Sequence, residues 1–353
     1  MRGQIEDFIK HRKLDMSIDS YQDLHPLHRF NVSLGNNGSL SKLKKYSKEL
    51  GLQLGCVEEP IFSTRYSKGV IQVDLMKDYP KDICFMAESK EAWNKGYKLP
   101  VFLGRCADGE SVDFDLTEAP HVLIGGTTGS GKSIMLHSIV ASMLQKHRSL
   151  GVKFIFIDPK RGEFSGYAGG PWNALGVVHD AKGAEEVIKR LLSEMEHRFD
   201  ALNKIGARSL SEIDGQKPFS YIVLVIDELS DMMYSSGKKF QNGLIRLAQK
   251  SRAAGIHIVA ATQHPSSKVL PGELKANFPV VIGCKTMSAI HSRVLFGESG
   301  AEKLLGRGDA FISGGRFNMK RFKGAYIDSG YAQHLHEPVS KKTIMDKIKE
   351  FVS

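Results

Sequence analysis

The stretch of sequence that decides the fold runs Gly126-Thr127-Thr128-Gly129-Ser130-Gly131-Lys132-Ser133. It matches the phosphate-binding pattern G-x-x-x-x-G-K-[ST] at every fixed position. A strand-like run, Val122 to Ile124, precedes it, and an apolar helical run begins at Ile134. Glycines let such a loop adopt positive φ, while successive N–H groups and a helix N-terminus face the phosphates. All eight residues are therefore predicted to bind ATP.

The residues beside this loop suggest hydrolysis as well as binding. Lys132 is predicted to reach the β- and γ-phosphates, and the Ser133 hydroxyl to bind Mg²⁺. An apolar strand over residues 221–226 ends in Asp227-Glu228, and the carboxyl ends of parallel strands border the ligand site. Asp227 is then placed to hold Mg²⁺ and Glu228 to act as general base. The alternative for this pair of carboxylates is a helix N-cap.

A third strand-like run, residues 256–261, is followed by Thr262-Gln263. A polar pair at this position can sense the γ-phosphate and report its hydrolysis. We predict this role for Gln263, with Thr262 in support. The alternative is an ordinary loop hydrogen bond.

The rest of the chain alternates between strand-length apolar runs and helical segments. This alternation is typical of an α/β fold whose parallel sheet is covered on both faces. Asp108-Gly109, between two further β-like runs, predicts a hairpin over residues 100–116. The expected strands of the parallel sheet are His121–Ile124, Val152–Ile157, Tyr221–Ile226, Ile256–Ala261 and Val280–Ile282. The expected helices are Ser133–Lys146, Ala181–Leu202, Lys238–Ala254 and Ala289–Leu295.

Four regions are expected along the chain. Residues 1–30 suggest a short polar helix and a connector containing His25 and His28, whose histidines are better explained as polar surface than as metal ligands. Residues 31–95 suggest a small α+β domain, and residues 96–332 the ATPase motor. Residues 333–353 suggest a terminal amphipathic helix.

Composition narrows the class of protein. The 353 residues carry a formal net charge of +10, which favours a polyanionic partner such as nucleic acid. The four cysteines form no CxxC pair, so neither a zinc ribbon nor a disulfide framework is expected. No run approaches the ~20 apolar residues of a membrane-spanning helix, and the N-terminus has no signal-like region. We therefore expect a cytoplasmic protein without direct membrane insertion.

Six separate segments of the sequence, in the order in which they occur, resemble the motor domain of the FtsK/SpoIIIE family of DNA translocases. The resemblance covers about nine-tenths of the chain, from Leu40 onward. It implies a RecA-like P-loop ATPase that forms a hexameric ring around double-stranded DNA, with ATP sites between subunits. The segments are Gly126–Ser133, Ile157–Lys160, Gly206–Leu210, Arg246–His257, Ala261–Pro265 and Gly300–Asp309.

The resemblance also suggests residues that act between subunits and on DNA. In such rings a neighbouring subunit supplies an arginine that stabilises transition-state charge. Arg198 is the first candidate and Arg293 the second, and an arginine on a helix surface with no such role is the alternative. Two basic loops are expected to grip the DNA backbone through Lys and Arg, without regard to sequence, and the alternative is a solvated charged helix face. The expected contacts are Arg208 and Lys217 in one loop, and Lys238 and Lys239 in the other.

The sequence departs from the family in showing neither a membrane-spanning N-terminal region nor a C-terminal winged-helix domain. These departures favour a motor of a mobile element, phage or defence system, recruited by an unknown protein. One alternative is the ATPase of a protein-secretion or conjugative coupling apparatus, which moves protein or nucleoprotein. Another is a nucleotide switch without turnover, against which the intact Glu228 argues.

Overall fold

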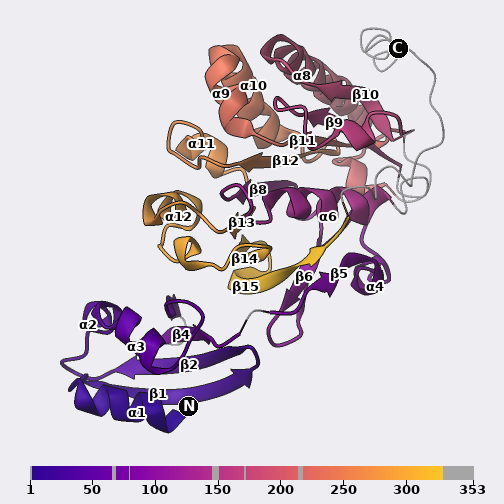
Figure 1. Ribbon diagram of the computed structural model, residues 1–353. Coiled ribbons are helices and arrows are strands. Elements are labelled where there is room, and N and C mark those ends of the chain that lie inside the picture. The colour runs from indigo at the N-terminus through magenta and orange to yellow at the C-terminus, as the bar shows by residue number, and fades with distance from the viewer. Residues whose placement is uncertain are drawn as a thin grey trace.

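Two β-sheets organise the chain (Figure 1), in a computed structural model that describes residues 2–65, 69–78, 80–144, 151–170, 172–213 and 218–328. Within these residues the larger sheet has eleven strands and the smaller has four. The larger sheet carries the phosphate-binding loop. The smaller sheet lies near the N-terminus, at the other end of the molecule from helices α8 to α10 (Figure 1).

One half of the large sheet is parallel and forms the centre of the motor. Its strand order is β10-β9-β11-β12-β8-β13, and every neighbouring pair in this half is parallel. Every residue of β11 is buried, as expected for a strand covered on both faces. The bounds are β10 Asn173–Val178, β9 Val152–Ile157, β11 Tyr221–Ile226, β12 Ile256–Thr262, β8 His121–Gly125 and β13 Val280–Cys284.

The other half of the large sheet continues from β13 with antiparallel pairing through β14, β15, β6 and β7. The short strand β5 pairs in parallel with the end of β15. In this half, β15, the last strand of the described chain, pairs with β6, the first of the strands that follow the small sheet and β5 in the sequence. The bounds are β14 Asp309–Gly314, β15 Phe317–Tyr326, β6 Pro100–Cys106, β7 Ser111–Asp115 and β5 Ile83–Cys84.

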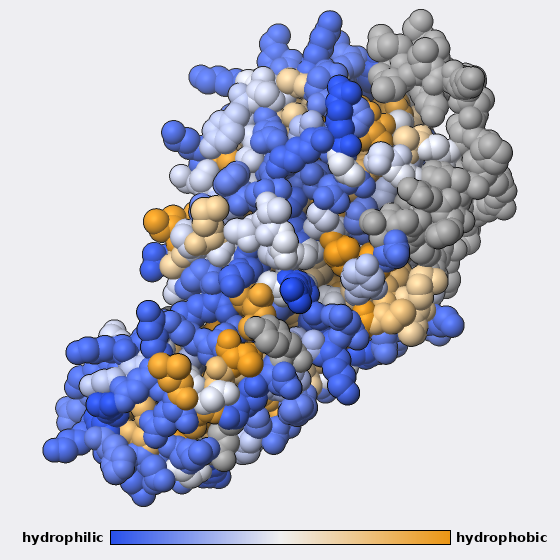
Figure 2. Space-filling view, in the orientation of Figure 1, coloured by the Kyte–Doolittle hydropathy of each residue, from blue (hydrophilic) through white to orange (hydrophobic). Residues whose placement is uncertain are grey.

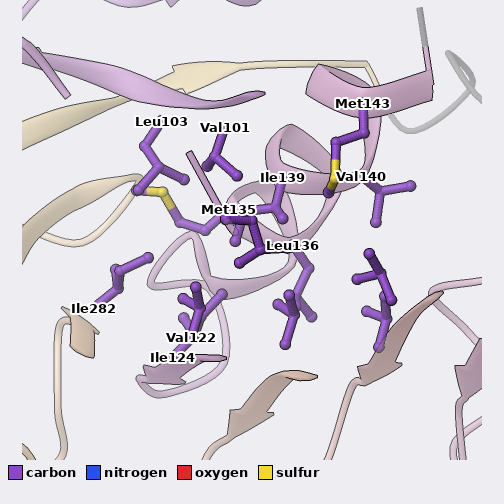
Figure 3. Packing of buried hydrophobic residues seen from close by; sticks show 14 of the residues in the cluster. Val101, Leu103, Val122, Ile124, Met135, Leu136, Ile139, Val140, Met143 and Ile282 are labelled. Carbon is purple, nitrogen blue, oxygen red and sulfur yellow. The ribbon is translucent and has the colours of Figure 1, made fainter. Parts of the chain in front are cut away.

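Helices cover both faces of the parallel strands. Side chains alternate between the two faces along a strand, so Val122 and Ile124 of β8 pack towards α6, while Leu123 belongs to the core beneath the helices of the other face. Figure 3 shows Met135 and Ile139 of α6 among these strand side chains. Helix α6 is Lys132–Leu144; α8 Ala181–Lys204, α9 Leu229–Ser235 and α10 Gly237–Lys250 cover the other face.

The shorter helices of the motor connect its strands. Helices α4 Phe85–Glu88 and α5 Lys90–Trp93 follow β5; α11 Gly272–Lys275 precedes β13 and α12 Ala289–Phe296 follows it. Single 3-10 turns occur at Ser165–Tyr167, Leu210–Glu212 and Ala301–Lys303.

The α/β fold expected from the sequence is confirmed. All five predicted parallel strands and all four predicted helices are present, with ends shifted by a few residues. The hairpin around Asp108-Gly109 is also present, since β6 and β7 pair in antiparallel register from Pro100↔Asp115 to Arg105↔Ser111. Helix α10 ends at Lys250 rather than Ala254, and residues 251–255 form a turn in which the Gly255 N–H donates to Arg252 O at 3.0 Å.

The small sheet corrects one expectation. The segment read as a connector is strand β1, Met16–Leu24, which pairs with β2, Leu27–Leu34. Its polar sequence is tolerated because β1 is an edge strand with no fully buried residue. His28 is buried, and its Nδ1 lies 2.8 Å from the Tyr21 hydroxyl. No metal-ligand cluster is found among the described residues.

The remaining elements of this region complete a small layered unit. The order of the sheet is β1-β2-β4-β3, and helices α1, α2 and α3 contribute apolar side chains to its core. Residue 31, the expected start of the small domain, lies within β2. The predicted C-terminal helix lies outside the described residues. The bounds are α1 Arg2–His11, α2 Leu40–Lys45, α3 Ser47–Gln53, β3 Ile61–Arg65 and β4 Val70–Met76.

Charged side chains join the small sheet to the motor. The Nη2 atom of Arg321, on β15, lies 2.6 Å from a carboxylate oxygen of Glu58 and 2.6 Å from one of Asp309, and all three side chains are buried.

The surface seen in Figure 2 is mainly hydrophilic, with scattered hydrophobic residues. No helix in the described part of the chain is long and apolar enough to cross a bilayer.

Candidate nucleotide-hydrolysis site

The phosphate-binding loop connects the carboxyl end of β8 to the start of α6. Gly129 and Gly131 have φ of 75° and 106°, the left-handed region that favours glycine. A Cβ on Gly131 would lie 2.5 Å from the nitrogen of Gly308, so only glycine fits against that neighbouring loop. The N–H groups of Gly131, Lys132 and Ser133 have no protein acceptor in the described chain. These donors, at the start of a helix, form an anion cradle.

Lys132 and Asp227 form a buried ion pair beneath the loop. The Lys132 ammonium donates to Asp227 Oδ1 at 3.0 Å and to its backbone oxygen at 2.9 Å, and neither side chain is more than 4% exposed. Burial raises the pKa of Asp227, and the charge of Lys132 offsets part of that rise. Asp227 comes directly after β11, so the parallel sheet places it beside the loop after β8.

Ser133 is linked to a carboxylate that sequence reasoning missed. Its hydroxyl donates to Glu163 Oε1 at 2.8 Å, and the other oxygen of Glu163 lies 3.4 Å from His137 Nε2. The ring of His137 is held through Nδ1, 2.8 Å from the hydroxyl of Tyr167. The hydrogen bond with His137, the largest cause, lowers the pKa of Glu163, while burial opposes it. A signal existed, since Glu163 follows β9 at the same edge of the sheet.

Glu228 is fully buried and hydrogen-bonded on both oxygens. It accepts from the Ser230 hydroxyl at 2.6 Å, from the Lys160 ammonium at 3.1 Å and from the backbone N–H of Gln263 at 3.1 Å. Burial alone raises the pKa of Glu228, but the Ser230 hydrogen bond, the charge of Lys132 and the hydrogen bond from Lys160 lower it overall. Glu228 also caps α9 through the N–H of Ser230. The N-cap considered as an alternative therefore coexists with a position beside the site.

Gln263 connects the phosphate-binding loop to Glu228. Its side-chain oxygen accepts from the Thr128 hydroxyl at 3.0 Å, and its N–H donates to Glu228. Thr262, the last residue of β12, accepts from Gly126 N–H through its backbone oxygen at 3.1 Å. This placement agrees with the loop position expected for a residue that senses the γ-phosphate. The sensing role itself stays a prediction.

The residues around Ser133 fit a magnesium ion. A hydroxyl and carboxylates are the oxygen ligands that Mg²⁺ prefers, and Ser133 and Asp227 are the predicted pair. Asp158 at the end of β9 adds a second buried carboxylate, which has an oxygen without a hydrogen-bond partner in the described structure. Asp158 and Glu163 both raise the pKa of Asp227. This convergence of acids would be stabilised by a cation.

A pocket of about 480 Å³ opens over the loop. Thr128, Lys132, Ser133, Glu163 and Gln263 line one end of it. Its other end reaches the last residues of β15. Asp227 and Glu228 lie just behind this lining, held by Lys132 and Gln263 respectively.

Arg198 does not have the environment expected of an arginine that acts on a neighbouring subunit. It is 3% exposed, pairs with Glu194 at 2.7 Å, and donates to the backbone oxygens of Ser220 and Ala254, each at 2.9 Å. Those two carbonyls precede β11 and β12, so Arg198 lies at the amino edge of the sheet, opposite the phosphate loop. The expectation that Arg198 acts in trans is wrong, because its guanidinium is occupied inside its own chain. Arg293, on α12, is exposed.

Three of the four expected DNA contacts, Arg208, Lys238 and Lys239, are exposed, but they are arranged differently from the expectation. Lys238 and Lys239 lie in the first turn of α10, not in a flexible loop, because α9 and α10 are separated by Ser236 alone. Arg208 follows α8 near Leu210, whose N–H bonds the carbonyl of Ala253 beyond the far end of α10. The two basic groups are thus separated by roughly 20 Å, the length of a 14-residue helix. Lys217 lies outside the described residues.

Comparison with protein families gives one match. The FtsK/SpoIIIE family model matches residues 83–267, more than half of the chain. A DNA translocase FtsK of Chlamydia muridarum is 33% identical over 334 residues, which cover 89% of this chain and 42% of that protein. The corresponding protein of Streptococcus pneumoniae is 35% identical over 283 residues, covering 76% and 37%. The chain thus spans less than half the length of these curated relatives.

Solved structures show the same fold at low sequence identity. The conjugation coupling protein TcpA of pCW3, determined with ATPγS, has a TM-score of 0.63 and 22% identity, covering 91% of this chain and 93% of that one. The type VII secretion ATPase EccC of Thermomonospora curvata has a TM-score of 0.62 and 22% identity, covering 75% and 36%. The fold is therefore that of P-loop ATPases, and with the family match and the geometry of its loop the chain belongs to the FtsK/SpoIIIE family.

Proposed function

We propose that this chain is the motor of an ATP-driven double-stranded DNA translocase, with Mg²⁺-ATP as its fuel. The observation that carries the proposal is the convergence at one sheet edge of a phosphate cradle, the Lys132–Asp227 pair and the hydrogen-bonded carboxylate of Glu228. A nucleotide switch requires the cradle but has no use for a base poised beside it. The relatives named DNA translocases support DNA as the cargo.

The geometry suggests how the residues act in hydrolysis. Lys132 would exchange its contact with Asp227 for phosphate oxygens, and Ser133 would exchange Glu163 for the metal. Mg²⁺, held by Ser133 and Asp227, neutralises charge on the phosphate oxygens when bound. Glu228, whose lowered pKa keeps it ionised near neutral pH, would accept a proton from the attacking water. Gln263, bonded to both Thr128 and Glu228, is placed to transmit loss of the γ-phosphate.

We propose further that identical subunits form a ring, with six the expected number, and that one subunit completes the site of its neighbour. With Arg198 excluded, Arg293 is the candidate for the arginine supplied in trans, and the exposed Arg252 beyond α10 is its matched comparison. Mixing provides the test. Arg293→Ala subunits and Glu228→Gln subunits are each expected to be inactive alone. A mixture of the two regains ATPase activity if Arg293 of one subunit and Glu228 of its neighbour act at one shared site. No recovery in the mixture of Arg293→Ala and Glu228→Gln subunits would contradict sharing, whereas Arg252→Ala subunits, the control, are expected to keep their activity alone.

Exposed basic groups at both ends of α10 support a grip on the DNA backbone. Arg208 near one end, and Lys238 and Lys239 at the other, would contact phosphates without reading sequence. The recruiting partner and the origin in a mobile element, phage or defence system stay predictions.

The test of the proposed function is the ATPase rate with and without linear double-stranded DNA, at low and moderate salt. We expect several-fold stimulation that fades as salt rises, because phosphate contacts release counterions. Glu228→Gln removes turnover under every condition. Robust turnover that ignores DNA would overturn the DNA proposal and favour a protein cargo.

A further inference from the structure

The pocket over the phosphate loop extends beyond the residues assigned to the phosphates and the metal. Besides Arg307, four side chains line this part of it, coming from the segment before β5, the first turn of α6 and the end of β15. They are Asp82, Ile134, Lys323 and Tyr326. The pocket is therefore longer than phosphate recognition alone requires.

Two backbone hydrogen bonds fix this end relative to the phosphate cradle. The N–H of Gly308 donates to Ser130 at 2.9 Å, and the N–H of Gly324 donates to Gly308 at 2.7 Å. Strand β15 also touches α6, since a Cβ on Gly324 would lie 2.2 Å from the Met135 methyl carbon. Tyr326 comes two residues after Gly324 on the same strand. The distance from cradle to tyrosine is thus set by backbone contacts rather than by a mobile loop.

This end of the pocket lies on the side of the phosphate loop towards which the nucleoside of a bound nucleotide would extend. In the strand order, β12 and β11 lie on one side of β8, and β13, β14 and β15 lie on the other. Asp227, Glu228 and Gln263 occupy the first side, where the γ-phosphate is hydrolysed. A nucleotide whose phosphates are held by the loop after β8 therefore extends its nucleoside towards β15.

The side chains at this end suit a nucleoside. Tyr326 is 60% exposed although Ala325 and Ile327 on either side of it are buried, so its ring is presented to solvent at the pocket edge. Ile134 packs partly against the small core containing Ala325 and Ile327. Asp82, 83% exposed, lies 3.0 Å from the Lys323 ammonium, which also donates to the backbone oxygen of Arg307 at 2.8 Å.

We propose that Asp82, Ile134 and Tyr326 form the nucleoside subsite, in which Tyr326 stacks on the base, Ile134 packs beside it and Asp82 accepts from the ribose hydroxyls. An aromatic ring stacks on any base because every base has a π-face. The subsite therefore selects for a nucleoside rather than for adenine alone. This inference rests on the proposed function, since it requires a triphosphate in the cradle.

Calorimetric titration separates the two ends of the pocket. ATP and inorganic tripolyphosphate, each with Mg²⁺, are titrated into the wild type and the variants Tyr326→Ala, Tyr326→Phe and Tyr234→Ala. We expect Tyr326→Ala to weaken ATP binding about tenfold, the size of one lost stacking contact, and to leave tripolyphosphate binding unchanged. Tyr326→Phe retains the ring and the affinity. Tyr234, 64% exposed on α9, is the matched control and has no effect.

A second comparison tests the ribose contact. Asp82→Ala is expected to weaken ATP binding several-fold but to leave binding of 2′,3′-dideoxy-ATP unchanged, because the latter has no hydroxyl to donate. Equal losses for both nucleotides would remove the ribose contact from the subsite. The subsite as a whole is overturned if Tyr326→Ala binds ATP like the wild type, or loses ATP and tripolyphosphate equally. Failure of the proposed function looks different, since Lys132→Ala would then bind ATP and tripolyphosphate as tightly as the wild type.

Discussion

The two edges of the parallel sheet both bury polar side chains, but for different purposes. At the carboxyl edge, Lys132, Asp227 and Glu228 are bonded largely to one another and to neighbouring side chains, next to an open pocket. At the amino edge, Arg198 and His257 are bonded to backbone oxygens that precede the strands.

This difference distinguishes a cluster of polar residues that acts on a ligand from one that stabilises the fold. Side chains paired with other side chains can exchange partners when a ligand arrives, as Lys132 and Ser133 would. Side chains that satisfy backbone carbonyls cannot leave without exposing a buried unpaired group. Changes at the carboxyl edge are therefore expected to reduce activity, and changes at the amino edge to reduce stability.

The largest expected effect belongs to Glu228→Gln. Loss of the general base is expected to lower the ATPase rate by about 100-fold or more, while ATP affinity stays within a few-fold, because the phosphate cradle is intact. Steady-state kinetics and calorimetry measure the two quantities. Asp231→Asn, on the helix α9 that Glu228 caps, is the control and should be nearly neutral. A variant of Glu228 that retained full turnover would remove the base from the mechanism.

Next comes Arg198→Met at the amino edge. Breaking a buried pair while leaving Glu194 and two carbonyls without their donor is expected to lower the free energy of unfolding by about 3–5 kcal/mol. Activity per folded molecule should change little. Chemical denaturation and ATPase assays on the same preparations check both statements, with the exposed Arg246→Met expected to cost under about 1 kcal/mol. A large loss of turnover without a loss of stability would restore Arg198 as a catalytic group.

The stability of the protein is also expected to fall at low pH, because of the buried His257. Burial lowers the pKa of His257 from 6.5 to about 4, so the folded state binds fewer protons than the unfolded state in this range. Its stabilising contribution is present above pH 6.5 and is lost as the pH falls towards 4, by about 3 kcal/mol. Denaturation of wild type and His257→Gln across this range tests the prediction. Parallel pH curves for the two proteins would contradict it.

The smallest expected effect concerns DNA. Replacing Lys238 and Lys239 together by alanine is expected to weaken binding to linear duplex several-fold at low salt. The slope of log affinity against log salt should fall by about 2 in magnitude, roughly one unit per lost phosphate contact. Lys44 and Lys45 on α2, also adjacent and exposed, serve as the matched control pair. An unchanged slope would place the DNA elsewhere.

The sequence predicted most of the carboxyl edge because short motifs encode it locally. The loop after β8 and the acid pair after β11 each need only a strand and a few following residues. Glu163 was missed because the sequence shows only that it follows a strand of the sheet, whereas its contact with Ser133 depends on the order of the strands, which no local pattern gives. Arg198 was misassigned for a similar reason: an arginine on a helix has the same sequence whether it faces solvent or the backbone of two distant strands.

Two other differences have local causes. Strand β1 was missed because its sequence, MSIDSYQDL, is polar, and only the edge position in the sheet makes that acceptable. The sequence also predicted a loop around Lys238 and Lys239. It is a compact junction instead, in which Gly237 adopts a φ of 66° and α10 begins at once. In both cases the composition was interpreted without the tertiary contacts that fix the backbone.

The most direct test of translocation is displacement of a triplex-forming oligonucleotide from linear duplex DNA. We predict ATP-dependent release of the third strand by the wild-type chain, no release by Glu228→Gln, and no release when ATP is replaced by a non-hydrolysable analogue. A preparation that hydrolyses ATP rapidly on duplex DNA yet leaves the triplex in place would contradict a motor that moves along DNA.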